Sequence, residues 1–593
     1  MAMAETGRRG PHSDPVGAMM ARQLFGFPGG LVLDDRKDRA LHAPIAPVPL
    51  PPLLVLPLKQ HLGAPAVPVV QEGQRVHFGQ LLARAADGIS ASVHAPADGE
   101  ISFIGLHPVP DDSGLAQPCI GLCTDETSAY EEEEFVDDIS LTDADLRERI
   151  AQAGIVGLGG AGFPSAQKLT DTPVKWLIIN GAECEPYISC DEALMRERAS
   201  AIIEGAQILA RLLRPQQVLF AIEDNKPEAI KAIADACDET AIEVVVIPTK
   251  YPSGAQKQLI QNLLGFEIPR GKHSVDLGVV MYNVGTCHAI ARAIAHSEPL
   301  VRRIVTITGD AVERPGNYEV AIGTPIEFLL QHVGVKTTQL RRLIMGGPIM
   351  GIALSDHTAP ISKLSNCLIA AGPGELDESL NPRPCIRCGD CVEVCPASLL
   401  PQELHWHIRA EQYARAEALD LRACIECGAC AYVCPSQIPL VQYYRHGKAV
   451  LAEQAAARAA ADHAKARFDA REARLAQART RRQQRKTAQA AAMGASPIGA
   501  VDATVASALA SNTGAATTPS EPITTASETD ANANNISTNN RINNSSTDKP
   551  VIAQHNDRLA DVLAAARRAK EKKQQTASPT VTGTDPSDEN AKP

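Results

Sequence analysis

RPCIRCGDCVEVCP at residues 383–396 and RACIECGACAYVCP at residues 422–435 repeat one cysteine spacing. Each run reads C-x2-C-x2-C-x3-C-P, a spacing that holds [4Fe–4S] clusters. Three cysteines in so tight a loop can each hold one iron of a cubane, and turn amides around Gly389 and Gly428 can donate to the sulfurs. The two runs therefore predict two [4Fe–4S] clusters and a protein that moves single electrons.

The ligands are expected to cross between the runs. In proteins with two such runs, the fourth cysteine of each run ligates the other cluster. The predicted sets are Cys385, Cys388, Cys391 and Cys434 for one cluster, and Cys424, Cys427, Cys430 and Cys395 for the other. Residues 375–445 then form a two-cluster, ferredoxin-like segment. Zinc is the alternative, but structural zinc sites use two well-separated pairs of ligands.

Composition limits the class of protein. The chain has 593 residues, enough for three or four domains at about 150 residues each. Its net charge of −12 argues against a nucleic-acid binder. Fifteen cysteines, eight of them at ligand spacing, indicate a reducing compartment, and the others are expected to be buried thiols. No stretch resembles a signal peptide or a membrane span, so we expect a cytoplasmic protein.

The N-terminal part predicts a β domain. After an N-terminal segment (1–42), residues 43–110 show short alternating apolar runs separated by glycines, preceded by a proline-rich stretch that cannot be helical. This region is similar to the barrel-sandwich domains of biotinyl and lipoyl carriers. Its expected tip, residues 87–91, has no lysine to modify, so we expect no prosthetic group there. Residues 111–140 are acidic and are expected to form a solvated linker.

The middle of the chain predicts an α/β domain over residues 141–298. Apolar strands at 176–179, 218–222 and 243–247 alternate with helical patterns, which favours a largely parallel sheet. Residues 299–360 change character, with two strands around Pro315-Gly316 followed by a short helix. We expect a β-grasp module there.

The C-terminal part is unlike the rest. Residues 446–494 are rich in alanine and arginine and predict a long basic helix or a solvated coil, most basic from Lys465 to Lys486. That stretch could meet anionic lipid or remain a solvated helix. Residues 495–593 are low-complexity and predict disorder, with one possible short helix near residues 557–573.

A glycine-rich loop, GLGGAGFP at residues 157–164, matches G-x-G-x-x-G. Alone the match is weak, since neither a clear strand before it nor a helix straight after it is evident. Its amides can still face a phosphate. Polar residues 180–185 follow an apolar strand, where α/β proteins bind ligands. The alternatives are a tight turn packed under the sheet and, for Glu183 and Glu185, a solvated edge.

Three motifs carry a family resemblance. GLGGAGFPSAQKL (157–169), INGAECEPYISCDEAL (179–194) and YNVGTCHAIARAI (282–294) are similar to the flavin- and NADH-binding subunit of respiratory complex I. Together with the N-terminal β domain and the two-cluster segment, residues 20–450 resemble the C subunit of the Rnf ion-translocating oxidoreductases.

The resemblance implies an FMN and NADH site in the α/β domain. Carried over by motif, the cofactor-binding residues are Gly157, Gly159, Gly160, Gly162 and Lys168 at the loop, Asn180, Glu183 and Glu185 at the flavin-side turn, and Asn283 and Thr286 closing the pocket. Two departures weaken the NADH site. Leu158 stands where complex I has an arginine, and residues 251–256 replace an acidic pair.

The resemblance also implies a function. An oxidoreductase and translocase subunit would pass electrons from NADH through FMN to two clusters, and then to integral membrane and iron–sulfur partner subunits. It would be peripheral, on the cytoplasmic face of the bacterial inner membrane. An alternative is a flavin-free iron–sulfur relay and docking scaffold. A third is a regulatory role that keeps a redox sensor reduced.

Overall fold

The structure is a computed structural model that describes residues 22–111, 114–125, 141–376 and 381–494. The predicted disordered tail, its short helix near 557–573, the acidic run at 131–134 and the start of the N-terminal segment lie outside the described residues. The predicted α/β multidomain architecture is confirmed by the sheets described below.

Two small antiparallel sheets form the N-terminal domain, in the orders β2-β8-β7-β4 and β3-β5-β6. Their strands are β2 (Leu53–Pro57), β3 (Val67–Pro68), β4 (Arg75–Val76), β5 (Leu81–Arg84), β6 (Val93–His94), β7 (Gly99–Pro108) and β8 (Ala116–Thr124). Alternate residues of these strands point into one shared core, which is the reason for their apolar alternation.

Strand β8 corrects the predicted acidic linker at 111–140. It pairs with β2 on one side and β7 on the other, and its Ile120 and Leu122 are fully buried. The sandwich domain therefore continues beyond residue 110. The sequence AQPCIGLCT lies next to an acidic run and has few residues with strong β propensity, so its strand character comes from packing on both neighbours.

Four parallel strands form the sheet of the middle domain, in the order β11-β10-β9-β12. They are β9 (Trp176–Gly181), β10 (Gln217–Glu223), β11 (Ile242–Ile247) and β12 (Val279–Asn283). Because all four run the same way, their carboxyl ends meet at one edge. Ligands of α/β proteins bind at such an edge.

Helices separate these strands, as the alternating pattern predicted. They are α3 (Asp143–Gln152), α4 (Cys190–Glu197), α5 (Ala199–Leu213), α6 (Pro227–Cys237), α7 (Gln256–Leu264) and α8 (Val284–Ala295), with short 3-10 turns at Ser165–Lys168 and Ser274–Leu277. Helix α5 lies tightly against α8, since a Cβ on Gly205 would be 1.9 Å from the carbonyl oxygen of Cys287.

A mixed sheet of six strands follows, in the order β1-β14-β13-β17-β15-β16. Its elements are β1 (Ala46–Pro47), β13 (Arg302–Thr308), β14 (Gly316–Ala321), α9 (Ile326–His332), β15 (Arg342–Met345), β16 (Ile352–Leu354) and β17 (Cys367–Ala371). The two strands around Pro315-Gly316 and the following helix agree with the prediction. The sheet also takes β17, beyond residue 360, and β1 from the proline-rich stretch.

An N-terminal strap, residues 22–41, joins distant parts of the chain. The Arg22 guanidinium lies 2.8 Å from Glu243 in β11, and Leu31 forms a β-bridge with Tyr251. The Gly30 amide donates to the carbonyl of Val394, at 2.9 Å. The strap ends in the short helix α2 (Asp38–Leu41). Its contacts with Glu243, Tyr251 and Val394 join it to both the parallel sheet domain and the cysteine segment.

Short helices build the cysteine segment. They are α10 (Asp390–Glu393), α11 (Pro401–Arg409), α12 (Tyr413–Ala418), a 3-10 turn at Leu421–Ala423, α13 (Ala429–Tyr432) and the start of α14 (Leu440–Gly494). The predicted long helix is present and begins at Leu440, six residues before the expected start. Tyr444 and Leu451 fix its first turns in the core of the segment.

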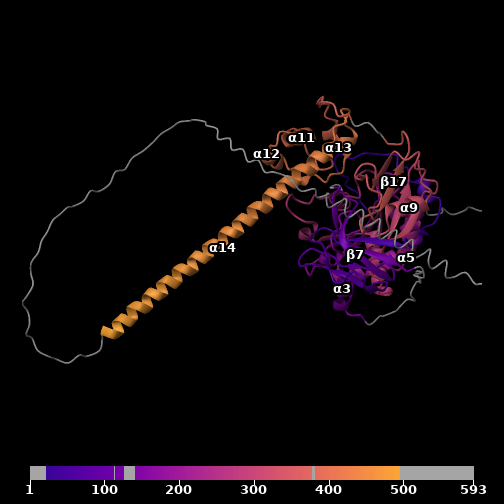
Figure 1. Ribbon diagram of the computed structural model, residues 1–593. Helices are drawn as coiled ribbons and strands as arrows, with labels where there is room; N and C mark the ends of the chain where they lie inside the picture. The colour runs from indigo at the N-terminus through magenta and orange to yellow at the C-terminus, as the bar shows by residue number, and fades with distance from the viewer. Residues whose placement is uncertain (1–21, 112–113, 126–140, 377–380, 495–593) are drawn as a thin grey trace, which may run out of the picture. The chain divides into compact units, whose positions relative to one another are not determined.

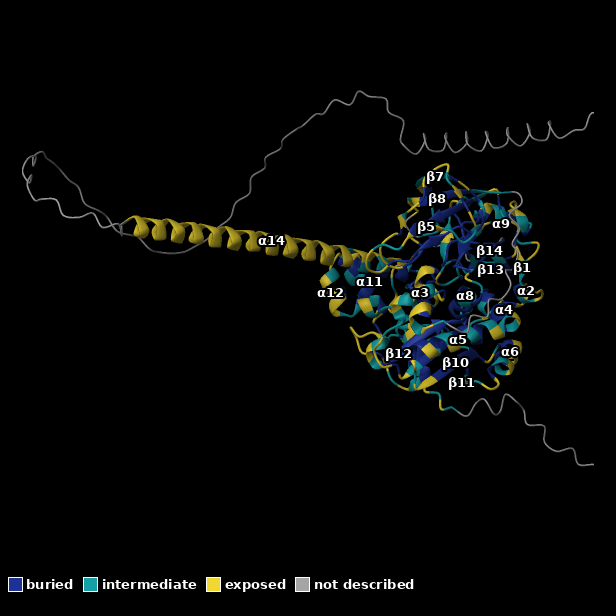
Figure 2. Cartoon of the chain, turned by 90° about the horizontal axis from the view of Figure 1, so that it is seen from below, coloured by how far each residue is buried: buried dark blue, intermediate teal, exposed yellow. Residues whose placement is uncertain are grey.

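The long helix α14 differs from the rest of the described chain in how far its residues are exposed to solvent. Figure 1 shows α14 as one unbroken helix, and Figure 2 shows it exposed along most of its length while the strands are largely buried. Every described residue from 452 to 493 is exposed. Among the described helices, none combines the length and the apolar character needed to cross a bilayer.

Candidate functional site

The glycine-rich loop is closed by its own backbone. The Gly157 amide donates to the carbonyl of Phe163 at 2.8 Å, and the Gly162 amide donates to the carbonyl of Gly157 at 3.1 Å. The Leu158 amide donates to Thr286 Oγ1 at 3.0 Å, which ties the loop to the first turn of α8. The motif thus forms a closed loop at the carboxyl edge of the sheet.

The tip of this loop faces outward. Gly159, Gly160 and Ala161 are exposed residues, and their amides make no hydrogen bond to any residue that the structure describes. Gly160 has a φ of +111°, which disfavours any side chain, and a Cβ on Gly159 would lie 3.2 Å from Cβ of Asn283. The glycine-rich loop therefore does not form the alternative structure, a tight turn packed under the sheet, because its tip is exposed. The open amides fit an anion such as a phosphate.

Lys168 supplies a positive charge beside the loop. Its Nζ donates to the carbonyl of Met281 at 3.2 Å and lies 5.0 Å from the ring centre of Tyr282. A Cβ on Gly157 would be 3.7 Å from the same Nζ. Burial lowers the pKa of Lys168 to about 8, so it is mostly protonated at neutral pH. The ammonium group therefore lies beside Gly157, at the base of the loop.

Asn283 caps α8 at the same edge. Its Oδ1 accepts from the Gly285 amide at 2.9 Å, and its Nδ2 donates to Asp191 at 2.6 Å. Together with Thr286, it brings β12, α8, α4 and the glycine-rich loop to one place. The structure therefore brings together the loop glycines, Lys168, Asn283 and Thr286.

The three residues of the predicted flavin-side turn are engaged by the protein itself. The Asn180 side chain donates to the carbonyl of Gly254 at 2.9 Å. Glu183 accepts from the amide of Asp191 at 2.9 Å and so caps α4. Glu185 accepts from the amide of Met350 at 2.7 Å, beyond the six-stranded sheet's β15. Glu183 is buried and Glu185 half-buried, so neither lies on a solvated edge.

A buried lysine from the strap compensates this acidic turn. Lys37 is 2% exposed, donates to the carbonyl of Glu183 and lies 3.6 Å from its carboxylate. Burial lowers the pKa of Lys37, but the carboxylates of Glu183, Glu223 and Glu192 outweigh that effect and leave the pKa raised. No sequence signal pointed to this residue, because a lysine among charged residues is typical of a surface.

Asp191 adds to the negative charge near α4. Burial, and then the neighbouring Glu183, raise the pKa of Asp191 to about 6. Ligand atoms of Glu183, Cys190 and Asp191 lie within 4.8 Å of one another, as in a metal site. Because Glu183 already accepts the amides of α4, helix capping accounts for this grouping.

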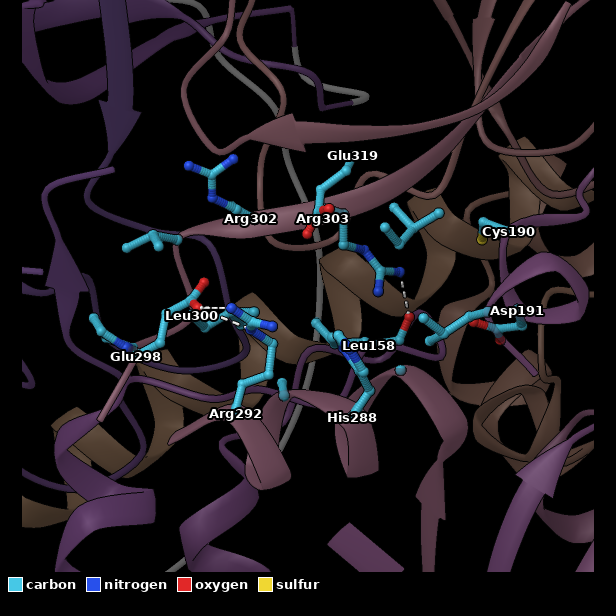
Figure 3. A pocket seen from close by; sticks show the side chains of 16 residues that line it. Leu158, Cys190, Asp191, His288, Arg292, Glu298, Leu300, Arg302, Arg303 and Glu319 are labelled. Carbon is cyan, nitrogen blue, oxygen red and sulfur yellow. Dashed lines mark hydrogen bonds and ion pairs between the residues drawn. The ribbon is translucent and has the colours of Figure 1, made fainter. Parts of the chain in front are cut away.

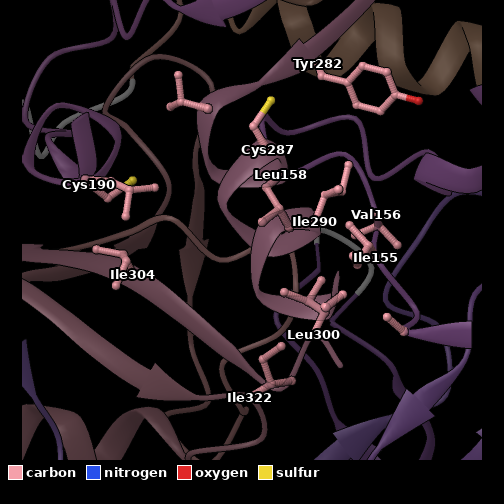
Figure 4. Close-up of a cluster of buried hydrophobic side chains, with 14 of the residues drawn as sticks. Ile155, Val156, Leu158, Cys190, Tyr282, Cys287, Ile290, Leu300, Ile304 and Ile322 are labelled. Atoms are coloured by element: carbon pink, nitrogen blue, oxygen red, sulfur yellow. The ribbon is translucent and has the colours of Figure 1, made fainter. Parts of the chain in front are cut away.

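Leu158 explains the first departure from the complex I motif. Its side chain is 4% exposed and belongs to the same buried cluster as Val156, Ile290 and Leu300. Its carbonyl accepts from Arg303 of β13 at 2.7 Å, and Figure 3 shows Arg303 reaching the loop from that strand. Figure 4 shows the apolar surroundings of Leu158. An arginine does contact this loop, but it comes from β13 and binds the backbone carbonyl of Leu158.

The cavity in Figure 3 lies beside Leu158 and has several ionisable side chains in its lining. They are Asp191, His288, Arg292, Glu298, Arg302, Arg303 and Glu319. Arg292 donates to Glu298 at 2.8 Å, and Arg303 donates to the carbonyls of Leu158 and Ser365. The Arg303 contacts tie β13 to the glycine-rich loop, and the Arg292 contact fixes the turn that follows α8.

The eight cysteines of the two runs line two separate cavities. The outer cysteine cavity, of about 260 Å³, is lined by Cys385, Cys388, Cys391 and Cys434. The inner cysteine cavity is lined by Cys395, Cys424, Cys427 and Cys430. Four soft sulfur donors around each cavity fit an iron–sulfur cluster. The grouping is the one that crossed ligation requires.

Local geometry supports this chemistry. The Leu399 amide donates to the sulfur of Cys395 and the Glu426 amide to that of Cys424, each at 3.4 Å. Gly389 and Gly428 have φ values of +97° and +77°, which allow the tight cysteine loops. Of the other cysteines, Cys123 and Cys184 are half-buried and the remaining five are buried, close to the prediction.

The inner cysteine cavity adjoins the sheet domain. Tyr251, in the second departure loop, is 2% exposed and donates its hydroxyl to the carbonyl of Cys427. Gln258 of α7 donates to the carbonyl of Pro396 at 3.0 Å. By contrast, Cys388 of the outer cysteine cavity is exposed, and its neighbour Ile386 is 67% exposed.

Models of four known families match successive parts of the chain. The RnfC barrel sandwich hybrid domain matches residues 25–127 and the Nuo51 FMN-binding domain matches residues 150–292. The SLBB domain matches residues 304–353 and the 4Fe-4S dicluster domain matches residues 384–438. The matches confirm the predicted fold class and agree with the predicted FMN and two [4Fe–4S] clusters.

Curated relatives share about half of their residues with this chain. The C subunit of the ion-translocating oxidoreductase complex of Pseudomonas aeruginosa PAO1 is 47% identical over 463 residues, which cover 77% of this chain and 60% of the relative. The protein of the same name from Yersinia pestis bv. Antiqua (strain Antiqua) is 48% identical over 469 residues, covering 78% of this chain and 75% of the relative. The chain thus spans about three fifths of the Pseudomonas relative.

Among solved structures, a chain of an NAD+-reducing [NiFe]-hydrogenase in the H2-reduced state is similar, with 18% identity and a TM-score of 0.37. The match covers 49% of this chain and 59% of the hydrogenase chain. A TM-score this low does not establish a shared fold.

Proposed function

The chain belongs to the family formed by the C subunits of ion-translocating oxidoreductase complexes, and from that premise we propose that it takes electrons from NADH on FMN and passes them singly through two [4Fe–4S] clusters to partner subunits. The observation that carries the proposal is the contact between Tyr251 and Cys427. It joins the edge of the parallel sheet, where the flavin motifs gather, to the inner cysteine cavity.

FMN would supply the conversion of a two-electron hydride into single electrons. The chain's own residues would hold it at the glycine-rich loop. The free amides of Gly159, Gly160 and Ala161 and the ammonium of Lys168 suit its phosphate, while Asn283 and Thr286 fix the loop against α8. Leu158 and Arg303 support the loop from beneath.

The two cavities give the path a direction. The inner cysteine cavity is buried against Tyr251 and the strap, so it is the cavity that would receive electrons from the sheet domain. The outer cysteine cavity includes exposed Cys388, so it would face the electron acceptor. Electrons would therefore pass from the cluster of the inner cysteine cavity to the cluster of the outer cysteine cavity.

We assign the acceptor and the ion pathway to partner subunits, namely integral membrane and iron–sulfur proteins of the same complex. The relatives' name describes a subunit of an ion-translocating complex. The chain would then be peripheral on the cytoplasmic face of the bacterial inner membrane.

Anaerobic titration of the full chain with NADH tests the proposal. Flavin absorbance should bleach first and cluster absorbance should follow. A flavin-free relay is the competing function, favoured by the burial of Leu158 where a flavin-site arginine is expected. Clusters that respond to dithionite but not to NADH, in protein that retains no flavin after incubation with FMN, would establish that relay and overturn the proposal.

A further inference from the structure

The exposed part of α14 carries an unusual density of positive charge. From Arg467 to Lys486 it contains eight cationic side chains and two acidic ones, Asp469 and Glu472. The eight are Arg467, Arg471, Arg474, Arg479, Arg481, Arg482, Arg485 and Lys486. All of them are exposed. We call these eight residues the cationic face.

The cations are confined to one side of the helix. At about 100° per residue, the eight positions fall within an arc of about 160°. Asp469 and Glu472 lie outside that arc, and Thr480, Gln484 and Thr487 occupy the opposite side. The face extends over twenty residues, which is about 30 Å at 1.5 Å per residue. One side of the helix is therefore positively charged over this whole length.

Two large apolar side chains stand inside the same arc. Phe468 is 59% exposed and Leu475 is 50% exposed, and they lie two helical turns apart. Within the described part of α14, nothing from the protein core covers them, because every residue from 452 to 493 is exposed. Apolar groups among cations suit a surface that is both anionic and able to take up hydrocarbon.

A helix surrounded only by water would be expected to place opposite charges next to each other along its surface. Opposite charges at i and i+4 stabilise an isolated helix, and like charges at that spacing destabilise it. On the cationic face three such pairs join two cations: Arg467 with Arg471, Arg481 with Arg485, and Arg482 with Lys486. An anionic surface relieves this repulsion.

We propose that the cationic face of α14 binds the surface of an anionic lipid bilayer. The guanidinium groups would contact lipid phosphates, and Phe468 and Leu475 would enter the boundary between headgroups and acyl chains. A second copy fits poorly, since two cationic faces repel each other. Nucleic acid would offer phosphates but no hydrocarbon for Phe468 and Leu475, and the chain as a whole carries a charge of −12.

Flotation of the full chain with lipid vesicles tests this surface. The chain should float with vesicles of phosphatidylcholine mixed with phosphatidylglycerol, and not with phosphatidylcholine alone. Arg474→Gln/Arg482→Gln removes two cations from the face and should weaken partitioning on the order of thirtyfold. Glutamine has a helix propensity close to that of arginine, so circular dichroism should show α14 unchanged.

The matched control is Arg458→Gln/Lys465→Gln, which removes two cations from the same helix outside the arc and should partition much more strongly than the face variant. Phe468→Ser/Leu475→Ser should also weaken binding while leaving the charge unchanged. Equal losses in the two charge variants would refute the face. Absence of flotation, or charge-dependent binding to RNA or to a second copy without flotation, would overturn the lipid assignment.

Discussion

Lys168 is the residue on which the proposed phosphate site depends most. It is half-buried between Met281 and Tyr282, and burial lowers its pKa to about 8. A bound phosphate would favour the charged ammonium and raise that pKa. Linkage through Lys168 then requires that FMN affinity fall as the pH rises above the pKa of this lysine in the free protein.

We therefore predict that FMN binding to the apoprotein weakens as the pH rises through about 8. Quenching of flavin fluorescence measures it. Lys168→Arg should keep the affinity level across that range, because a guanidinium remains protonated. Lys168→Gln should bind FMN about tenfold or more weakly, since a hydrogen bond to a charged group is lost. A native chain whose affinity does not change with pH would contradict this role.

Lys37 acts on stability. It lies among Glu183, Glu192 and Glu223, and removing it leaves the buried carboxylate of Glu183 without its paired cation. Lys37→Met should lower the free energy of unfolding by about 3 kcal/mol, measured by denaturant titration.

Lys59→Met changes an exposed lysine and serves as the control for Lys37. The double variant Lys37→Met/Glu183→Gln should recover part of the loss, because it also removes a buried charge. A loss in Lys37→Met no larger than in the control would show that the buried pair contributes nothing.

Among the elements, the two cysteine runs depend on each other. We predict that Cys395→Ser disrupts the cluster of the inner cysteine cavity, whose other ligands would be Cys424, Cys427 and Cys430. Electron paramagnetic resonance of the dithionite-reduced protein should then show one cluster signal, and NADH should no longer reduce the remaining cluster efficiently.

Cys388→Ser is the matched change in the outer cysteine cavity. It should leave the inner cluster reducible by NADH and stop transfer beyond it. Flavin content reports whether each variant folds. A Cys395→Ser protein that loses only the cluster of Cys385, Cys388 and Cys391 would refute crossed ligation.

Elements differ in how far sequence alone could predict them. The cysteine loops could be predicted because the spacing of ligands is a local property of the sequence. The α/β alternation could be predicted because the period at which apolar residues recur indicates which side of an element is buried. Strand β8 was not, since its strand character depends on pairing with both neighbours. The same limit applied to Arg303 and Lys37, which reach the site across 145 and 146 residues of sequence.

At the scale of the whole molecule, Tyr251 is one of the contacts between the sheet domain and the cysteine segment, and the one that reaches a predicted cluster ligand. Tyr251→Phe removes the hydroxyl that donates to Cys427 but keeps the buried ring. We expect a loss of about 1 kcal/mol in the free energy of unfolding. Stopped-flow mixing with NADH should show normal flavin reduction and slower cluster reduction.

Tyr432→Phe removes the hydroxyl of a tyrosine that is 63% exposed and is the control for Tyr251. Its unfolding and reduction kinetics should match the native chain. If Tyr251→Phe behaves in the same way, the contact does not serve electron transfer between the two regions.

The strap has a consequence for biosynthesis. Gly30 is synthesised before its hydrogen-bond partner Val394, which follows more than three hundred residues later. The sheet domain can fold while translation continues, but the strap can close only once the cysteine runs have emerged. Until then Leu31 and Tyr251 lack the cysteine segment against which they pack. After the runs emerge and before the strap closes on them, they would be accessible to the machinery that inserts clusters, and strap closure would mark the end of assembly.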